Sequence, residues 1–413
     1  MRTQTAGSST ILAALGTVLL LTTTASASSS PGVATRADGS GGSLLAFTGW
    51  TDADTEQSLL TLNTASHEVE PVARGGGIGA LTWSRDGQRL FWIGYDGRQD
   101  GSSTLYSARP DGSQRQTLMT GYDIRAVTAG PDGTVAVARA GIPTNVDCAT
   151  NPPTPPADLV LIDPDSGAGS RTAVRILTPA QVVTNELVFS RDDSVLLWRA
   201  IPGDPCGGSS NPQLFLTDLA TGATRQVAGD AQGSGWASFS VDGTTVISAK
   251  SDGQGQDLVR TDVTSATSIR LRTPTYAEAL PTFSPDGTKL AMIRTPGVPE
   301  QGIIFRPSGA PRVVITDAEG RLLRDLGEAP VSAEHLAWSP DGTFLALDGF
   351  TSVPACEGCD YGSADPAIWA LPVDGDAPTQ LSTAGGFASS GLAFQPTFPD
   401  PPLIERRARQ LRP

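Results

Sequence analysis

The chain has 413 residues, with 43 acidic and 29 basic side chains and a formal net charge of −14. A strongly acidic chain without a basic stripe is poorly suited to bind nucleic acid or an anionic membrane surface, so neither class of partner is expected. The excess of carboxylates mainly keeps the protein soluble.

Residues 1–27 have the pattern of a secretory signal peptide. A positive start, Met1-Arg2, is followed by an apolar run at 11–21 and by the small-residue sequence ASA that ends at Ala27. The apolar run is about half of the roughly 20 residues that cross a bilayer, so no membrane span is expected in the mature chain. We therefore predict cleavage near Ala27 and a secreted or cell-envelope, extracytoplasmic location.

The segment 28–43 is rich in Ser, Gly and Pro and has no core-forming residues, which is typical of a flexible linker. We expect the ordered body at 44–398. The tail at 399–413 is arginine-rich and is interpreted as a disordered basic end.

Short apolar runs alternate through the body with clusters of Gly, Pro, Asp and Ser, and no segment has a long apolar period of 3.6 residues. This pattern predicts an all-β chain of short strands. One phrase recurs, in which a strand, usually ended by an aromatic residue, is followed by a turn and a second apolar strand. Its copies are LTWSRDGQRL at 81–90, TAGPDGTVAV at 128–137, LVFSRDDSVL at 187–196, ASFSVDGTTV at 237–246, FSPDGTKLAM at 283–292 and LAWSPDGTFL at 336–345.

A third apolar strand and a weaker fourth run follow each copy. Four strands in a repeat of about 45 to 60 residues are typical of a propeller blade with loop insertions. The copy at 128–137 is degenerate, because Ala129 stands where the others have an aromatic residue.

The two ends of the body together supply one more unit. GLAFQP at 391–396 is a first strand without followers, whereas SLLAFTG at 43–49, SLLTLNTA at 58–65 and HEVEPVA at 67–73 are later strands without a first. Sharing a blade between the termini closes the ring and leaves no open sheet edge. We predict a single all-β propeller of seven four-stranded blades closed by a composite N- and C-terminal blade, with six blades as the alternative.

These repeats, aromatic-Ser-Pro-Asp-Gly-x-x-Leu-Ala followed by apolar-x-Asp-x-x-x-Gly, resemble TolB-type, WD-repeat-like propeller repeats over nearly all of 81–396. Such repeats occur in exported bacterial proteins and in the propeller domains of prolyl-oligopeptidase-like enzymes. The resemblance implies the fold, and it leaves the function open because the repeat family serves many roles. A typical TolB protein has an α/β domain before a six-bladed propeller, where this chain has a linker.

The aspartates of the recurring phrase are expected to be structural. In FSPDGT, Pro285 presets φ, Asp286 bonds nearby N–H groups and Gly287 accepts a positive φ. Asp193 replaces this glycine in one copy and is still a residue type that tolerates the left-handed region. The six carboxylates are expected to lie around one face, too far apart to pair as acid and base: Asp86, Asp132, Asp192, Asp242, Asp286 and Asp341.

The connections between second and third strands are expected on the opposite face. Four of them are long, at 140–158, 200–213, 295–311 and 350–367. Long loops on one face of a rigid ring predict a binding face for a protein, peptide or glycan, and neutral insertion is the alternative.

All four cysteines lie in these connections, and an even number in an exported chain predicts disulfides. Cys148 and Cys206 are expected to link adjacent blades, and Cys356 and Cys359 to form a tight local bridge. Redox chemistry would need a thioredoxin-like helix that this pattern lacks. A metal site is not predicted, because the only histidines, at 67 and 335, are far from either pair in sequence.

Connections from a fourth strand to the next first strand place polar residues at the mouth of the channel. The candidates are Asp123, Arg125, Glu186, Trp236, Tyr276, Glu278, Glu334 and His335. Such a set can bind a cationic peptide, a sugar or a metal ion, and solvated charges are also the ordinary lining of a propeller channel.

The sequence has no G-x-S-x-G, no H-E-x-x-H and no phosphate loop. We therefore interpret the chain as an exported, non-catalytic TolB-like scaffold that binds its partner through the long loops, as a monomer without a cofactor. The alternative is a propeller-fold hydrolase, lyase or sugar oxidoreductase, with Glu186, Glu278 and Glu334 as acid and base candidates. Such chemistry needs two carboxylates about 5–10 Å apart.

Overall fold

The computed structural model describes residues 42–49, 57–95, 102–130, 133–140, 157–164, 175–177, 181–202, 213–227, 237–251, 256–271, 275–299, 305–350, 366–382 and 392–396. The chain divides into two units, Met1–Gly41 and Gly42–Pro413, and all of these residues belong to the second. The expected signal peptide, most of the linker and the basic tail lie outside them. No helix in this part of the chain is long and apolar enough to cross a membrane.

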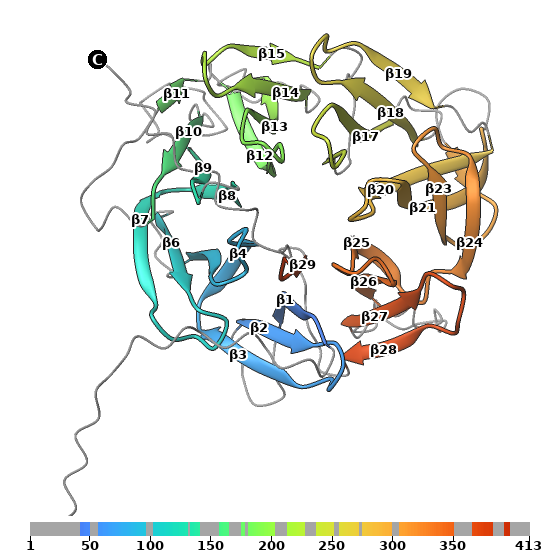
Figure 1. Ribbon diagram of the computed structural model, residues 1–413, viewed down its shortest axis with the longest axis horizontal. Helices are drawn as coiled ribbons and strands as arrows, with labels where there is room; N and C mark the ends of the chain where they lie inside the picture. The colour runs from blue at the N-terminus through green and yellow to red at the C-terminus, as the bar shows by residue number, and fades with distance from the viewer. Residues whose placement is uncertain are drawn as a thin grey trace, which may run out of the picture. The chain divides into compact units, whose positions relative to one another are not determined.

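Seven antiparallel sheets lie in a ring around a channel, each with its first strand innermost (Figure 1). The closing blade is β29 (Ala393–Phe394), β1 (Leu44–Gly49), β2 (Ser58–Asn63) and β3 (Val69–Arg74). Blade 2 is β4 (Gly77–Trp83), β5 (Leu90–Tyr95), β6 (Ser102–Ala108) and β7 (Gln116–Tyr122), and blade 3 is β8 (Ile124–Ala129), β9 (Val135–Ala140), β10 (Ala157–Ile162) and β11 (Arg175–Leu177).

Blade 4 is β12 (Gln181–Phe189), β13 (Val195–Pro202), β14 (Gln213–Asp218) and β15 (Thr224–Gln226). Blade 5 is β16 (Ala237–Phe239), β17 (Thr245–Ser251), β18 (Gln256–Asp262) and β19 (Ser268–Leu271). Blade 6 is β20 (Tyr276–Phe283), β21 (Lys289–Pro299), β23 (Arg312–Asp317) and β24 (Leu322–Glu328), and blade 7 is β25 (Ser332–Trp338), β26 (Phe344–Phe350), β27 (Pro366–Pro372) and β28 (Thr379–Ser382). The prediction of seven four-stranded blades is confirmed, including the degenerate copy.

The closing blade has the predicted composite form. Its inner strand, β29, pairs with β1 in the register Leu45↔Phe394 and Ala46↔Ala393. Two contacts tie it to its neighbours: the indole Nε1 of Trp83 donates to the carbonyl of Ala393 at 2.7 Å, and the rings of Phe344 and Phe394 meet edge to face. Ring closure therefore depends on a strand of two residues.

Alternating apolar residues bury both faces of each blade. In β21, Leu290 and Met292 pack toward blade 5, whereas Ala291 and Ile293 pack toward blade 7. This alternation is what a strand period of two requires when both faces are buried. The core is therefore a series of layers between neighbouring blades.

One predicted loop is partly a hairpin. β21 continues to Pro299, and β22 (Phe305–Pro307) pairs back onto its end in the register Gly297↔Pro307. Within the connection predicted at 295–311, residues 297–299 and 305–307 thus form a two-stranded extension of blade 6. Sequence reasoning missed it because the prolines at its edge suggest a loop, although proline is compatible with edge strands.

The recurring turn has the predicted structural role. In blade 6 the Ser284 hydroxyl donates to Asp286 Oδ1 at 2.6 Å, and the same oxygen accepts the N–H of Thr288 at 3.0 Å. These bonds, led by the one from Ser284, hold the pKa of Asp286 below its usual range. The same serine–aspartate bond recurs at Asp86, Asp192, Asp242 and Asp341. Asp132 lies outside the described residues.

The glycine of this turn has a second task that the sequence did not reveal. Gly287 has φ 74°, and a Cβ added there would lie 3.0 Å from the Cβ of Val241 in the preceding blade. The turn glycine is therefore needed both for its left-handed backbone and for the close approach of two blades.

We expect Gly287→Ala to lower the free energy of unfolding by about 1 kcal/mol more than Gly222→Ala. Gly222 is the matched control, because its φ is 70° and an added Cβ would meet nothing within 4 Å. Urea denaturation of the two variants measures the difference. Equal losses would show that the approach of Val241 is relieved without strain.

Candidate functional site

The channel is a cavity of about 630 Å³ lined by the inner strands of all seven blades. One tier of its wall comes from the residue two places before the end of each described first strand: Leu81, Val127, Leu187, Ala237, Pro281, Leu336 and Leu392. Nearer the serine–aspartate turns lies a tier in which four residues carry hydroxyls, Thr82, Thr128, Ser238 and Thr282, whereas Val188 and Ala393 are apolar. We call these the apolar tier and the hydroxyl tier.

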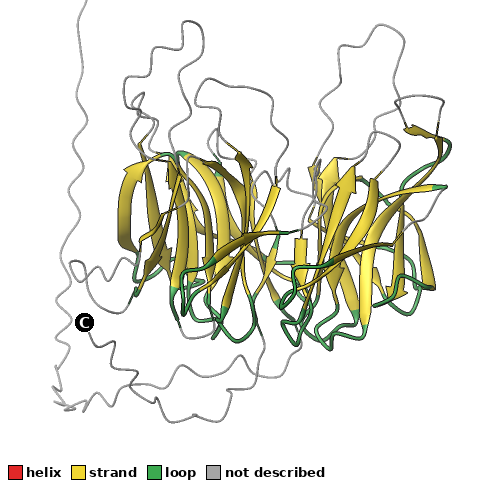
Figure 2. Ribbon diagram, turned by 90° about the horizontal axis from the view of Figure 1, so that it is seen from above, coloured by secondary structure: helices red, strands yellow, loops and turns green. Residues whose placement is uncertain are grey.

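At the other end of the channel, Tyr95, Arg125 and His335 are the ionisable residues of the described wall, and we call this end the mouth. The serine–aspartate turns lie at the opposite ends of the inner strands, on the side where most described turns gather in Figure 2. The side chains that line the channel are therefore mostly polar at both ends and apolar between them.

Bulges shape this mouth. The pairing of the first and second strands shifts register at one level in five blades, between Ile78 and Leu81, Ile124 and Ala126, Val183 and Leu187, Ala279 and Thr282, and Ala333 and His335. A bulge inserts an extra residue, bends the strand and re-aims its side chains. Leu280 takes the left-handed region, with φ 52°, at one of them. Sequence reasoning missed these bulges, because only backbone pairing reveals them.

Tyr95, Asp123 and Arg125 form one side of the mouth. The Nε of Arg125 donates to Asp123 Oδ2 at 2.7 Å, and its Nη2 contacts the same oxygen. The Tyr95 ring lies where a Cβ on Gly79 would be 2.9 Å away, and its hydroxyl donates to the carbonyl of Ile124 at 3.3 Å. Burial, and then the Asp123 carboxylate, raise the pKa of the Tyr95 phenol.

His335 and Asp348 form a second polar pair at the channel. The imidazole Nδ1 lies 3.1 and 3.0 Å from the two carboxylate oxygens, and the Asp348 side chain is 2% exposed. Burial raises the pKa of Asp348, although the contact with His335 opposes this shift. A carboxylate in this position fixes the orientation of the ring and its tautomer.

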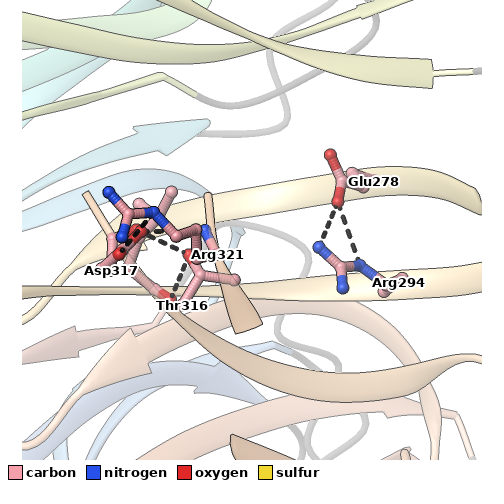
Figure 3. Close-up of polar contacts among 6 residues, drawn as sticks. Glu278, Arg294, Thr316, Asp317 and Arg321 are labelled. Carbon is pink, nitrogen blue, oxygen red and sulfur yellow. Dashed lines mark hydrogen bonds and ion pairs between the residues drawn. The ribbon is translucent and has the colours of Figure 1, made fainter. Parts of the chain in front are cut away.

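Glu278 is not a free carboxylate. Its Oε1 accepts bonds from Arg294 Nε at 3.0 Å and Nη2 at 2.6 Å, and Figure 3 shows the two side chains meeting from neighbouring strands. The residues are 2% and 8% exposed. The Arg294 guanidinium also lies 5.2 Å from the centre of the Tyr276 ring. The pair is therefore a buried ion pair covered by an aromatic ring.

A second pair in Figure 3, Asp317 and Arg321, lies at the turn between β23 and β24 of the same blade, with 3.5 Å between the charged atoms. It belongs to an exposed turn, because the Arg321 side chain is 80% exposed. Exposed pairs of this kind contribute about 0–1 kcal/mol to stability. The two ion pairs of this blade thus differ in burial and in their expected contribution to stability.

The remaining predicted site residues divide as follows. Glu334 lies at the bulge of β25 and is exposed. For Glu186 only the backbone, in β12, is described, and Trp236 lies outside the described residues. Cys148, Cys206, Cys356 and Cys359 also lie outside them, so the disulfides stay a prediction. Of the eight predicted residues, Arg125 and His335 line the channel itself.

Sequence reasoning missed Tyr95, Arg294 and Asp348. A charged residue inside an otherwise apolar second strand, as in KLAMIR and FLALDG, was a signal that could have found the last two. Within the described ranges there is no group of three or more His, Cys, Asp or Glu residues that could hold a metal ion.

No protein-family model matches the sequence, and no curated protein sequence matches it. Solved structures are similar to it. TolB from Acinetobacter baumannii has a TM-score of 0.51 at 16% identity, covering 86% of this chain and 67% of that one. Oligogalacturonate lyase from Vibrio parahaemolyticus has a TM-score of 0.53 at 15% identity, covering 82% of this chain and 85% of that one.

The β-propeller domain of the Trilobed protease from Pyrococcus furiosus has a TM-score of 0.56 at 10% identity, covering 83% of this chain and 95% of that one. That domain is described as having an open velcro topology, whereas β29 closes the ring here. Identities this low show the fold alone. The chain is a seven-bladed β-propeller whose fold is similar to that of TolB and to the propellers of these enzymes.

Proposed function

We propose that this chain is an exported, non-catalytic TolB-like scaffold that binds a protein, peptide or cell-wall ligand on the face that carries its long connections. The observation that carries the proposal is the inequality of the two faces. Outside the closing blade, short turns of similar sequence join the first and second strands. At the opposite face the ends of β9 and β10, of β13 and β14, and of β26 and β27 are separated by 141–156, 203–212 and 351–365. Variable loops on a rigid frame are the usual carriers of recognition.

The state of two predicted site carboxylates supports the non-catalytic part of the proposal. Asp123 is paired with Arg125, and Glu278 with Arg294. A general acid or base must reach the substrate and exchange its proton there. Carboxylates that are engaged by internal cations are poorly placed for this work.

The test is to replace 141–156 and 351–365 by two-residue Asn-Gly turns, separately and together. The Glu319→Gln variant, on the turn face, is the matched control. A partner captured from the secreted or cell-wall fraction by the intact chain is expected to be lost by the loop variants and retained by the control. The unfolding midpoint is expected to stay within about 3 °C.

Sequencing of the exported chain is expected to give Ser28 as the first residue.

Unchanged partner binding by all three loop variants would refute the proposal. The His335–Asp348 pair favours one alternative, a propeller-fold hydrolase or lyase. The purified chain would then turn over an oligogalacturonate or peptide substrate, and His335→Gln would abolish this activity. That result would support the enzyme and overturn the scaffold proposal.

A further inference from the structure

The channel wall has an uneven distribution of charge. The ionisable residues that line it are Tyr95, Arg125 and His335, and the carboxylates of Asp123 and Asp348 contact Arg125 and His335 without themselves belonging to the described lining. The formal net charge of the chain is −14. A site in an acidic protein that presents a guanidinium and an imidazole to its cavity favours an anionic ligand over a cationic one.

Arg125 has the geometry to accept such a ligand. The contact with Asp123 uses Nε and Nη2, both on a single carboxylate oxygen, whereas a guanidinium has five N–H donors. Asp123 holds the guanidinium in place from a left-handed backbone, with φ 44°, and the Arg125 side chain remains 32% exposed. Asp123 therefore acts as a positioning residue.

The wall beyond the mouth defines the rest of the ligand. The apolar tier supplies one residue from each blade, so a ligand that passes the mouth meets Val127, Leu187 and Leu336 next. Polar groups that lack hydrogen-bond partners there would lose their hydration. A short apolar group can pack against the apolar tier without losing hydrogen bonds. The cavity volume of about 630 Å³ is within the range of small-molecule sites.

We propose that the channel binds a small apolar monocarboxylate, with its carboxylate at Arg125 in the mouth and its apolar body against the apolar tier. This deepens the proposed binding role by naming a ligand chemistry, and it rests on that role only in placing a ligand on the same face. The residues named here all lie in or beside the described inner strands, outside the long connections.

Calorimetric titration of the whole chain with hexanoate, hexanamide and hexylammonium tests the proposal. Hexanoate is expected to bind with a stoichiometry of one. Hexanamide, which has the same length without the charge, is expected to bind about tenfold more weakly, and hexylammonium more weakly still. A higher salt concentration is expected to reduce the difference in affinity between hexanoate and hexanamide, because salt screens the charge of the carboxylate.

Two variants separate the parts of the site. Arg125→Gln is expected to weaken hexanoate about tenfold and to leave hexanamide unchanged. Leu336→Asn is expected to weaken both ligands together. Arg109→Gln, at an exposed turn on the other face, is the matched control and is expected to bind as the unmodified chain does. Circular dichroism verifies that each variant folds. If a variant does not fold, the comparison of the three ligands on the unmodified chain still tests the preference for a carboxylate.

Equal affinities for hexanoate and hexanamide would overturn the proposal, as would an Arg125→Gln variant that binds hexanoate normally. Tighter binding of the neutral, blocked acetyl-leucinamide than of hexanoate would also overturn it and assign the channel to peptides. The variant without 141–156 and 351–365 is expected to retain hexanoate binding. If this variant loses the captured partner and still binds hexanoate, the result bears on the scaffold proposal and does not contradict the channel site.

Discussion

Deletion of residues 392–413 is expected to lower the free energy of unfolding by roughly 5 kcal/mol, because it removes β29 and opens the ring. The loss includes the ladder to β1, the bond from Trp83 to Ala393 and the packing of Phe394 on Phe344. It also leaves β1 as an unpaired inner edge. Chemical denaturation followed by tryptophan fluorescence measures the change.

Deletion of 397–413 is the matched control, because it leaves β29 and Gln395 in place. Gln395 holds the end of the strand, since its N–H donates to the carbonyl of Leu44 at 2.8 Å. This shorter deletion is expected to change the stability by less than about 0.5 kcal/mol. If the two deletions destabilise the chain equally, the closing contribution assigned to β29 is wrong.

Removal of the Glu278 carboxylate is the second change with a large expected effect. Glu278→Ala leaves the Arg294 guanidinium buried without its partner, which is expected to cost about 3–5 kcal/mol. Thermal unfolding at neutral pH measures the loss. The neighbouring Glu334 is exposed, and Glu334→Ala is expected to change the stability by less than about 0.5 kcal/mol.

A double variant separates the charge from the packing. Glu278→Leu combined with Arg294→Met replaces the ion pair by apolar side chains and is expected to recover most of the stability, because no charge is then left buried. A Glu278→Ala variant that is fully stable but loses a ligand or an activity would show that Glu278 has a functional role instead.

The blade count was predictable because the turn phrase carries its own local determinants. Ser284, Asp286 and Gly287 are each required by a bond or a backbone angle within a few residues, so the same letters recur wherever the turn recurs. Ala129 interrupts the pattern, and β8 still forms, because Val127 and Val137 bury the same face. The fold therefore followed from short-range chemistry.

The site depended on contacts that short-range chemistry does not determine. Glu278 was a plausible acid–base candidate in sequence, yet its pairing with Arg294 follows from a cross-strand register set by the bulge at Leu280. Asp193 was predicted to tolerate a left-handed backbone, and its φ is 56°. Its carboxylate, however, lies 2.5 Å from where a Cβ on Gly130 of another blade would be, which no local pattern reveals. Partners across strands and blades need the assembled ring.

The pairing of β29 with β1 also has a kinetic consequence. Most strand pairs join neighbours in sequence, whereas Leu45 and Phe394 come together from the two ends of the body. Contacts of such long sequence separation are made late, since the entropy of closing a long loop must be overcome before they contribute. A nascent chain can form blades 2 to 7 early, because each is built from strands that follow one another in sequence. It completes the ring only after 393–394 have been synthesised. Until that step, β1 is an edge to which the strand of another nascent chain can add.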